Sequence, residues 1–177
     1  DMLAFAKRNE NLAITTVPEP EKEIILGDIF TGLHKPAIAR VHAPVFAGGF
    51  LIICGCTYVV ASDNAVFSLP EVKRGLWPMQ VMESLLNIIP PRKVLDLCIL
   101  GKKITGSEAY NLGLVTHLTS TIHLDEEVSK LAEEVCNNSP TAIRMGLHAY
   151  DEMRSIDSKS RHVFLKQRLA ELLKTED

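Results

Sequence analysis

Residues 38–78 read IARVHAPVFAGGFLIICGCTYVVASDNAVFSLPEVKRGLWP, and this stretch decides the fold that we expect. It predicts an apolar strand, a tight turn at Gly48-Gly49, a buried helix from Phe50 and a second strand. The carboxylate of Glu71 then follows, with apolar residues next to it in the sequence. Short strands that alternate with helix-sized apolar segments favour a parallel sheet covered by helices. The sequence therefore predicts an α/β fold.

The glycine turn suggests a chemistry for this region. A Gly-Gly step between a strand and an apolar helix lets backbone N–H groups approach a ligand closely, with the positive end of the helix behind them. Such donors stabilise a carbonyl oxygen that becomes negative when its neighbouring carbon turns carbanionic. A poorly solvated carboxylate can move the proton that this reaction requires. Glu71 is the candidate, although a solvent-facing residue at the end of a strand is the alternative interpretation.

The segments on either side of this core are predicted to be mostly helical. Apolar periodicity indicates helices over residues 22–33, 125–137, 140–154 and 160–174, and a short strand over residues 114–118. Residues 2–9 form a short amphipathic piece, and residues 15–20 read as a proline-punctuated loop. Thr105 and Glu108 have the spacing of a capping box, and Gly113 stands where a glycine ends a helix.

Composition excludes several classes of function. A chain of 177 residues with a net charge of −3 suits one domain and has no basic surface for nucleic acid. The apolar run at residues 50–54 is too short to cross a bilayer, so no membrane partner is expected. Four cysteines stand in apolar patterns without zinc-site spacing: Cys54, Cys56, Cys98 and Cys136. Buried reduced thiols are expected, which fits a reducing, cytoplasmic location.

Further motifs follow the glycine turn in a characteristic order. Residues 35–39 (KPAIA) precede the turn, and five motifs come after it: residues 61–65 (ASDNA), 67–71 (FSLPE), 75–76 (GL), 101–105 (GKKIT) and 108–115 (EAYNLGLV). From about Lys35 to about Ala149, this order resembles the crotonase superfamily, the enoyl-CoA hydratases and isomerases. The resemblance implies a crotonase-like layered spiral of parallel strands and helices over residues 1–117, and a C-terminal helical trimerisation region over residues 118–177.

The resemblance also implies that part of the family's fold is absent from this sequence. In the family, an N-terminal part supplies several strands, a second oxyanion-hole amide and many contacts to coenzyme A. Its usual S-A-G-x-D string does not occur here. We therefore expect the sequence to be an incomplete copy of a longer protein that lacks its front and a C-terminal segment. A naturally minimal domain is the alternative.

The family's catalytic groups can be carried over to three positions. The resemblance makes the N–H of Gly48 the retained oxyanion donor and Glu71 the second of the two hydratase glutamates. The first glutamate falls on Leu51, which cannot exchange a proton or bind water. Isomerisation, which needs one glutamate, suits these residues better than hydration. A hydratase with its second polar group elsewhere, and a non-catalytic binding or assembly homologue, stay open.

The implied substrate is an acyl-CoA thioester. Coenzyme A then enters as part of the substrate, and neither a tightly bound cofactor nor a metal is expected. The substrate-binding candidates flank the two reacting groups: Ala47, Gly49, Leu51, Leu76, Trp77, Pro78 and Met79. Trp77, Met79 and Met82 suit either a wall for an acyl chain or a helical core stripe. His42 and the pair Lys102-Lys103 are weaker candidates, since a strand-end histidine and a solvated lysine pair are common.

Assembly is the last implication of the resemblance. Crotonase relatives form trimers that often pair into hexamers, so we expect a homotrimer or hexamer. The apolar stripe over residues 161–174 suits either intramolecular docking or a subunit contact. We expect Phe164 and Leu169 to be buried inside or between subunits.

Overall fold

A computed structural model describes residues 26–30 and 32–175 of the chain. The amphipathic piece and the loop predicted over residues 2–9 and 15–20 lie outside the described residues. The helix predicted over residues 22–33 is only partly described. Its described residues contain a single 3₁₀ turn, η1 (Leu26–Asp28), and no α-helix, so the prediction is wrong there. Residues 29, 30 and 32 lie in turns, and residues 33–37 form an irregular segment ahead of the first strand.

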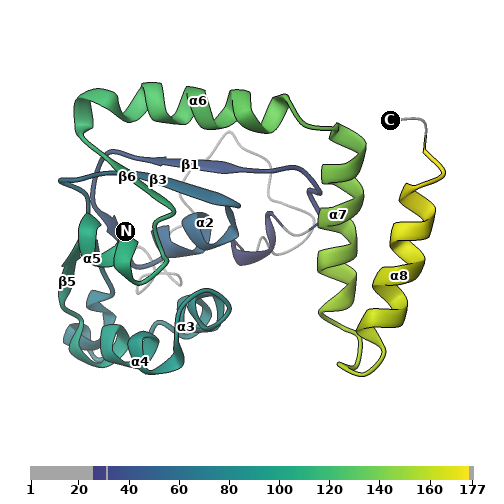
Figure 1. Ribbon diagram of the computed structural model, residues 1–177. Helices are drawn as coiled ribbons and strands as arrows, with labels where there is room; N and C mark the ends of the chain where they lie inside the picture. The colour runs from purple at the N-terminus through teal and green to yellow at the C-terminus, as the bar shows by residue number, and fades with distance from the viewer. Residues whose placement is uncertain (1–25, 31, 176–177) are drawn as a thin grey trace, which may run out of the picture.

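One sheet holds three parallel strands in the order β1-β3-β6, with β1 at Ile38–Val41, β3 at Tyr58–Ser62 and β6 at His117–Thr119. This confirms the predicted first strand. The last strand begins three residues later than expected, because Leu114 and Val115 are buried in the core ahead of it. The sheet lies between the long helix α6 (Leu124–Cys136) and the body of the molecule (Figure 1).

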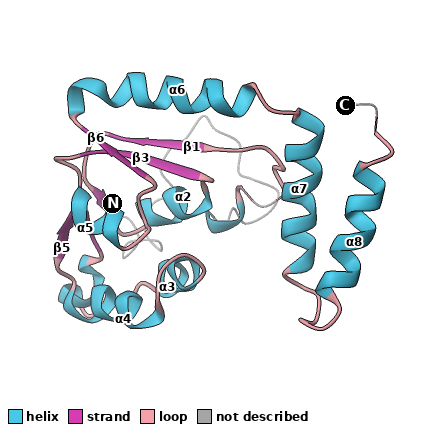
Figure 2. Ribbon diagram, in the orientation of Figure 1, coloured by secondary structure: helices cyan, strands magenta, loops and turns pink. Residues whose placement is uncertain are grey.

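A second sheet has the order β2-β4-β5, with β2 at Val45–Phe46, β4 at Val66–Ser68 and β5 at Lys103–Thr105. Strands β2 and β4 are parallel, whereas β5 runs antiparallel to β4. This antiparallel strand was not predicted from the sequence. Figure 2 shows the strands against the surrounding helices. The carboxyl ends of β2 and β4 point the same way, which positions the candidate site.

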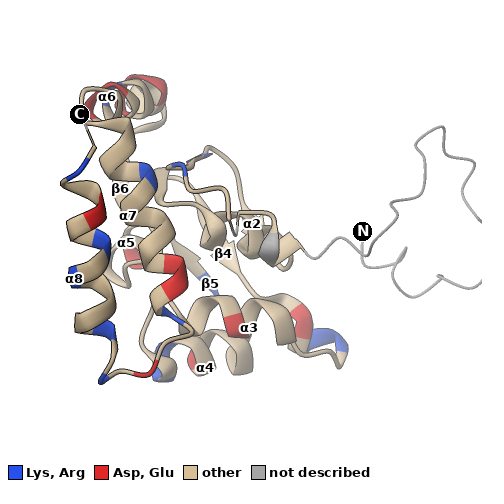
Figure 3. Ribbon diagram, turned by 90° about the vertical axis from the view of Figure 1, so that its right-hand side faces the viewer, with Lys and Arg blue, Asp and Glu red and all other residues tan. Residues whose placement is uncertain are grey.

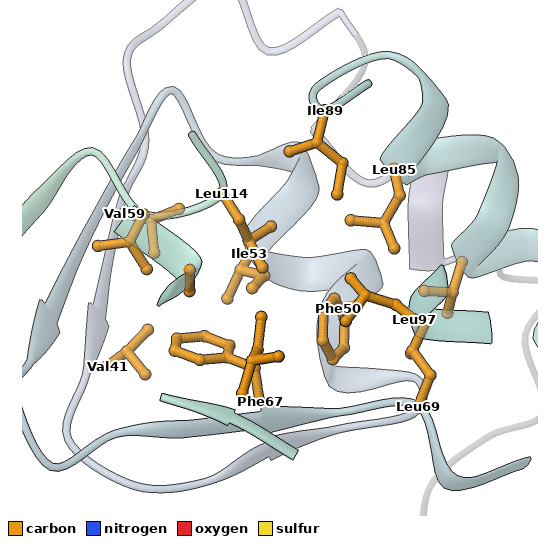
Figure 4. Close-up of a cluster of buried hydrophobic side chains, with 14 of the residues drawn as sticks. Val41, Phe50, Ile53, Val59, Phe67, Leu69, Leu85, Ile89, Leu97 and Leu114 are labelled. Carbon is orange, nitrogen blue, oxygen red and sulfur yellow. The ribbon is translucent and has the colours of Figure 1, made fainter. Parts of the chain in front are cut away.

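Helix α2 (Gly49–Gly55) forms the centre of the main core. Phe50 is fully buried and meets Phe67 of β4 edge to face, with ring centroids 6.2 Å apart (Figure 4). In β3, Val59 and Ala61 belong to this core, while Val60 belongs to a second cluster under α6. The alternation explains the strand's apolar run, because the sheet is covered on both faces.

Helices α3 (Met79–Leu86) and α4 (Pro91–Leu100) close the main core on the side away from α6 (Figure 1). The short helix α5 (Gly106–Asn111) follows β5 and begins with the predicted capping box. In this box the Glu108 amide donates to Thr105 Oγ1 at 3.2 Å, and the Thr105 amide donates to Glu108 Oε2 at 2.8 Å. The Thr105 amide and, at 3.0 Å, the Thr105 hydroxyl both donate to the Glu108 carboxylate, and these two hydrogen bonds lower its pKa.

The last two helices form a hairpin beside the sheets (Figures 1 and 3). Helix α7 (Pro140–Met153) packs against α8 (Arg161–Leu172), and Arg168 of α8 pairs with Glu152 of α7 at 2.9 Å. Together with α6, these helices confirm the three helices predicted for the C-terminal part. The division at residues 117 and 118 stays a prediction; it falls within strand β6.

Candidate active site

The two candidate reacting groups leave neighbouring strands at the same edge of a sheet. Strands β2 and β4 are parallel and in register, with Phe46 opposite Ser68. Gly48 comes two residues after Phe46, and Glu71 comes three residues after Ser68. Because adjacent strands lie about 4.8 Å apart, their carboxyl ends bring the segments that follow them together. The sheet therefore brings the starts of two segments that are separated in sequence to the same edge.

The turn after β2 has an unusual backbone. Ala47 adopts a positive φ of 51°, a conformation that non-glycine residues rarely take. Its amide donates to Ser68 O at 3.2 Å, which ties the turn to β4. Nothing lies within 4 Å of the point where a Cβ of Gly48 would stand, so the chain faces open space there. A ligand can thus approach the backbone at Gly48.

The amide groups at the start of α2 are available as donors. The first backbone hydrogen bonds of the helix run from Phe50 N to Ala47 O at 3.0 Å and from Leu51 N to Gly48 O at 3.1 Å. Within residues 26–30 and 32–175, the amide of Gly48 donates no hydrogen bond. Helix starts leave such amides free. Since α2 has only seven residues, these individual N–H groups, rather than a long helix dipole, are what the turn offers.

Glu71 lies in the 3₁₀ turn η2 (Pro70–Arg74), directly after β4. Its side chain is only 7 % exposed, so the alternative of a solvent-facing residue at a strand end is wrong. Its backbone carbonyl accepts from the Leu76 amide at 3.1 Å, and Gly75 ends the turn with a positive φ of 72°. In the described part of the chain, Oε2 of Glu71 is buried without a hydrogen-bond partner. Buried carboxylate oxygens without partners are uncommon, and they often have a functional reason.

A buried thiol near Glu71 was not recognised as part of the site from the sequence. Cys98 of α4 is fully buried, as expected for a core cysteine. Its pKa is raised, first by burial and second by the negative charge of Glu71. The helical spacing of Val94, Leu97 and Cys98 predicts a buried face, but it carries no information about which residue that face meets.

Leu51 occupies the interior of the protein. It is 5 % exposed and belongs to the main hydrophobic core. A Cβ at Gly27 of η1 would lie 3.9 Å from Leu51 Cδ2, so the side chain extends toward that turn. Its assignment to substrate binding, like those of Ala47 and Gly49, stays a prediction.

The segment after Glu71 presents apolar side chains to the surface. Leu76 is 54 % exposed and Met79 is 65 % exposed, whereas Pro78 is buried. Trp77 is half-buried, and its indole N–H donates to Met82 Sδ at 3.3 Å. The tryptophan's polar group is therefore satisfied inside the protein. Trp77 and Met82 pack against the main core, as the core stripe predicts, whereas Met79 lies outside it, so the wall for an acyl chain stays a prediction.

The weaker candidates lie in ordinary surface environments. His42 is exposed. Lys102 pairs with Asp96 at 2.7 Å, and this hydrogen bond raises the pKa of Lys102. Lys103 is exposed within β5. These observations favour an ordinary solvated lysine pair over a role of Lys102 and Lys103 in the site.

The cysteines differ more than the sequence suggests. All four are free. Cys54 and Cys56 are half-buried, and burial, together with the neighbouring Cys56, raises the pKa of Cys54 to about 12. Cys136 is exposed, so the expectation of four buried thiols is wrong there; it ends α6 beyond the sheet. Among the described residues, no group of three or more metal-ligating side chains could hold a metal ion. No helix in this part is long and apolar enough to span a membrane.

A cavity of about 900 Å³ lies elsewhere, between the C-terminal end of α2 and helix α7. Its lining includes Ile53, Cys54 and Tyr150, but neither Gly48 nor Glu71. Its size alone does not make it the reacting centre, because the free amide of Gly48 lies at the opposite end of α2 and Glu71 does not line the cavity.

Comparisons with known proteins give a consistent result. Residues 6–177 match the family described as enoyl-CoA hydratase/isomerase. A carnitinyl-CoA dehydratase of Escherichia coli K12 is 35 % identical over 119 residues, which are 67 % of this chain and 45 % of that protein. The relative from Salmonella typhi is 34 % identical over the same length. The chain thus spans about half the length of the curated relatives that it matches.

Solved structures agree in fold. An enoyl-CoA hydratase from Mycobacterium tuberculosis superposes with a TM-score of 0.75 at 27 % identity, covering 81 % of this chain and 57 % of the other. One from Bacillus anthracis gives a TM-score of 0.80 over 85 % and 59 % of the two chains; at 24 % identity it shows the fold alone. The expected crotonase-like α/β fold is confirmed.

Proposed function

The chain belongs to the enoyl-CoA hydratase/isomerase family, and from this premise we propose that the protein processes an acyl-CoA thioester through an enolate-like intermediate. The free Gly48 amide holds the thioester oxygen as it becomes negative, and Glu71 moves the proton. The observation that carries the proposal is the buried Oε2 of Glu71, which has no hydrogen-bond partner within the described part of the chain.

The reaction proceeds by proton transfer at carbon. Glu71 removes a proton from the carbon next to the thioester carbonyl or from the position beyond it, and the electron pair moves onto the thioester oxygen. Backbone donors that are already in place stabilise this oxyanion without reorganisation. The protonated Glu71 then returns the proton to the other carbon, which moves the double bond. Coenzyme A takes part only as a portion of the substrate, and the exposed side chains of Leu76 and Met79 contact the acyl chain.

Isomerisation is favoured over hydration because Leu51 supplies no second acid or base. General acid–base groups contribute roughly 10²–10⁴-fold to a rate, so water addition at this site is slow. The alternative activity is hydration or dehydration, which the name of the carnitinyl-CoA dehydratases supports. A non-catalytic binding or assembly role is the alternative from a different class. Like the family's assemblies, the protein is proposed to form a trimer or hexamer.

A panel of thioesters separates these functions. The protein is incubated with 2-enoyl-CoA, 3-enoyl-CoA and carnitinyl-CoA, and the products are separated by mass and retention time. An isomerase interconverts the two enoyl isomers without a change in mass. Water addition as the main reaction contradicts the isomerase assignment, and the absence of turnover with every thioester contradicts an enzymatic function.

The variant Leu51→Glu tests whether the missing carboxylate limits hydration. A glutamate at position 51 is expected to raise water addition at least tenfold, because it restores a group able to bind water. Ile52→Glu is the matched control, since Ile52 is the next residue on α2 and is 46 % exposed. Thermal unfolding shows whether each variant is folded. A folded Leu51→Glu protein without faster water addition means that the leucine is not what suppresses hydration.

A further inference from the structure

The cavity beside α7 is too large to be a packing void. Its volume is about 900 Å³, whereas protein interiors leave few voids larger than a water molecule. Small-molecule sites typically enclose about 300–1,000 Å³. The apolar part of its lining includes the buried Ile53 and Leu114 and the exposed Leu33 and Ile88. The cavity therefore presents apolar surface to a molecule that enters it.

Polar contacts join α7, which stands beside the sheets in Figure 1, to the body of the molecule. His34 Nε2 lies 3.5 Å from Asp151 Oδ2, and the His34 and His148 ring centroids are 4.5 Å apart. Arg154 Nη2 donates to Asn87 Oδ1 at 3.1 Å. His34 also has a positive φ of 48°, and backbone strain of this kind in a non-glycine residue often accompanies a functional site. These contacts fix the width of the cavity.

Most of the acidic groups in the lining have a partner or are neutral. Asp151 lies beside the histidine described above, and Glu83 Oε1 accepts from Asn87 Nδ2 at 3.1 Å. Burial raises the pKa of both thiols in the lining, Cys54 and Cys56, so they carry their protons at neutral pH. The lining therefore has no free thiolate, and both of its carboxylates already have a polar contact.

The basic groups in the lining have free donors. Lys35 is exposed, and within the described residues its ammonium group forms no ion pair or hydrogen bond. Arg154 forms no ion pair in the same part of the chain, and its contact with Asn87 uses one of five N–H groups. A guanidinium group can bind a carboxylate through two parallel hydrogen bonds. The segment ahead of β1 and the end of α7 thus each offer an anion a cationic donor.

We propose that this cavity binds a carboxylate that carries an apolar chain, such as a medium-chain fatty acid. Lys35 and Arg154 hold the carboxylate, and the chain lies over Ile53, Ile88 and Leu114. The bound anion links α7 to the body of the molecule, because its two cationic partners belong to different elements. The site is distinct from the two proposed reacting groups, which do not line the cavity, and it does not rest on the proposed function.

Three probes with the same octyl-sized chain test the charge preference: octanoate, 1-octanol and octyltrimethylammonium. Each is titrated into isoleucine-methyl-labelled protein and followed by ¹³C NMR, with two resonances identified in Ile53→Val and Ile88→Val. Octanoate is expected to shift both resonances saturably and to bind at least about fivefold more tightly than 1-octanol. The cationic probe is expected to bind most weakly. Equal affinity for the three probes, or no saturable shift with octanoate, overturns the proposal.

Charge variants locate the head of the bound probe. Lys35→Gln and Arg154→Gln are each expected to weaken octanoate binding about threefold, and together about tenfold, because each removes a partly screened positive charge. Binding of 1-octanol should stay within about twofold. The control Lys130→Gln, at an exposed position on α6 outside the lining, leaves the octanoate affinity unchanged. Unchanged octanoate affinity in the folded double variant contradicts the assigned cations.

Methionine-methyl labelling separates this cavity from the exposed apolar side chains near the candidate active site. Octanoate that shifts the Met79 resonance but neither isoleucine is bound at that other surface, and this result also overturns the proposal. The comparison of probes on wild-type protein decides the matter if the charge variants do not fold. A protein inactive on every thioester contradicts the proposed function, and the octanoate titration still decides whether the cavity is a carboxylate site.

Discussion

Glu71 and Leu51 are both buried, at 7 % and 5 % exposure, but only Glu71 carries an ionisable side chain. Two carboxylates facing one substrate can share the tasks of holding water and delivering a proton. One carboxylate can still carry a proton from one carbon to another, because the base that removes the proton becomes the acid that returns it. In the proposed mechanism, a single carboxylate therefore favours a shift of a double bond over the addition of water.

The cysteines give a prediction at the same scale. Only the thiolate reacts with alkylating reagents. Burial raises the pKa of Cys54 to about 12, whereas Cys136 is exposed. At pH 8 iodoacetamide is therefore expected to modify Cys136 well before Cys54, as peptide mass mapping of folded protein can show. Modification of Cys54 at an equal rate contradicts the burial of its thiol.

The same thiol affects stability at alkaline pH. The Cys54 pKa is raised from 9.0 to about 12 in the folded protein, so the unfolded chain loses this proton first. Between these values the folded state binds more protons than the unfolded state. The free energy of unfolding therefore falls as the pH rises through this window.

At the scale of elements, local pattern predicted the strand, the glycine turn and the C-terminal helices, because each carries its own periodicity or cap. It could not predict the antiparallel strand β5 (Lys103–Thr105), which exists only through its pairing with β4. It could not decide the burial of Glu71 either. That burial comes from η2 and from α4, a helix that follows later in the chain, so it is a tertiary property. The candidate site comes from the family resemblance and stays a prediction, whereas the effect of the Glu71 charge on Cys98 is visible only in the packed structure.

The turn between β2 and α2 gives a prediction for one element. Ala47 has a φ of 51°, which costs a non-glycine residue roughly 1–2 kcal/mol. Ala47→Gly is therefore expected to raise the free energy of unfolding by up to about 1 kcal/mol. Ala132→Gly in the middle of α6 is the control, and there the same change lowers it by about 1 kcal/mol. Urea unfolding measures both, and destabilisation of similar size in the two variants contradicts the strained turn.

At the scale of the whole molecule, the α7–α8 hairpin lies beside the two sheets rather than inside their core (Figure 3). Arg168 holds the hairpin together by pairing with Glu152 and by lying 5.1 Å above the Phe164 ring. Leu169 is 55 % exposed and Val163 is 63 % exposed in the single chain. The expected burial of Phe164 is thus only partly met within one chain, and that of Leu169 requires a partner.

This exposed surface leads to a prediction about assembly. Burying a Val, Leu or Phe side chain is worth roughly 1.5–3 kcal/mol, so we expect α8 to be covered in a trimer or a multiple of one. Leu169→Glu is expected to shift the protein toward monomers in sedimentation velocity, because it places a charge in the contact. The control Gln167→Glu, at an exposed position of the same helix, leaves the assembly unchanged. Monomeric wild-type protein at micromolar concentration contradicts the proposed assembly.

Solvent hydrogen exchange tests proton transfer by Glu71 most directly. The protein is incubated in D₂O with 3-enoyl-CoA, and deuterium in the recovered thioester is measured by mass spectrometry. Wild-type protein is expected to exchange hydrogen next to the carbonyl or at the position beyond it. Glu71→Gln should lose at least a hundredfold in rate, while Glu133→Gln, at an exposed position on α6, keeps the wild-type rate. Exchange at the wild-type rate in folded Glu71→Gln protein would show that another residue moves the proton.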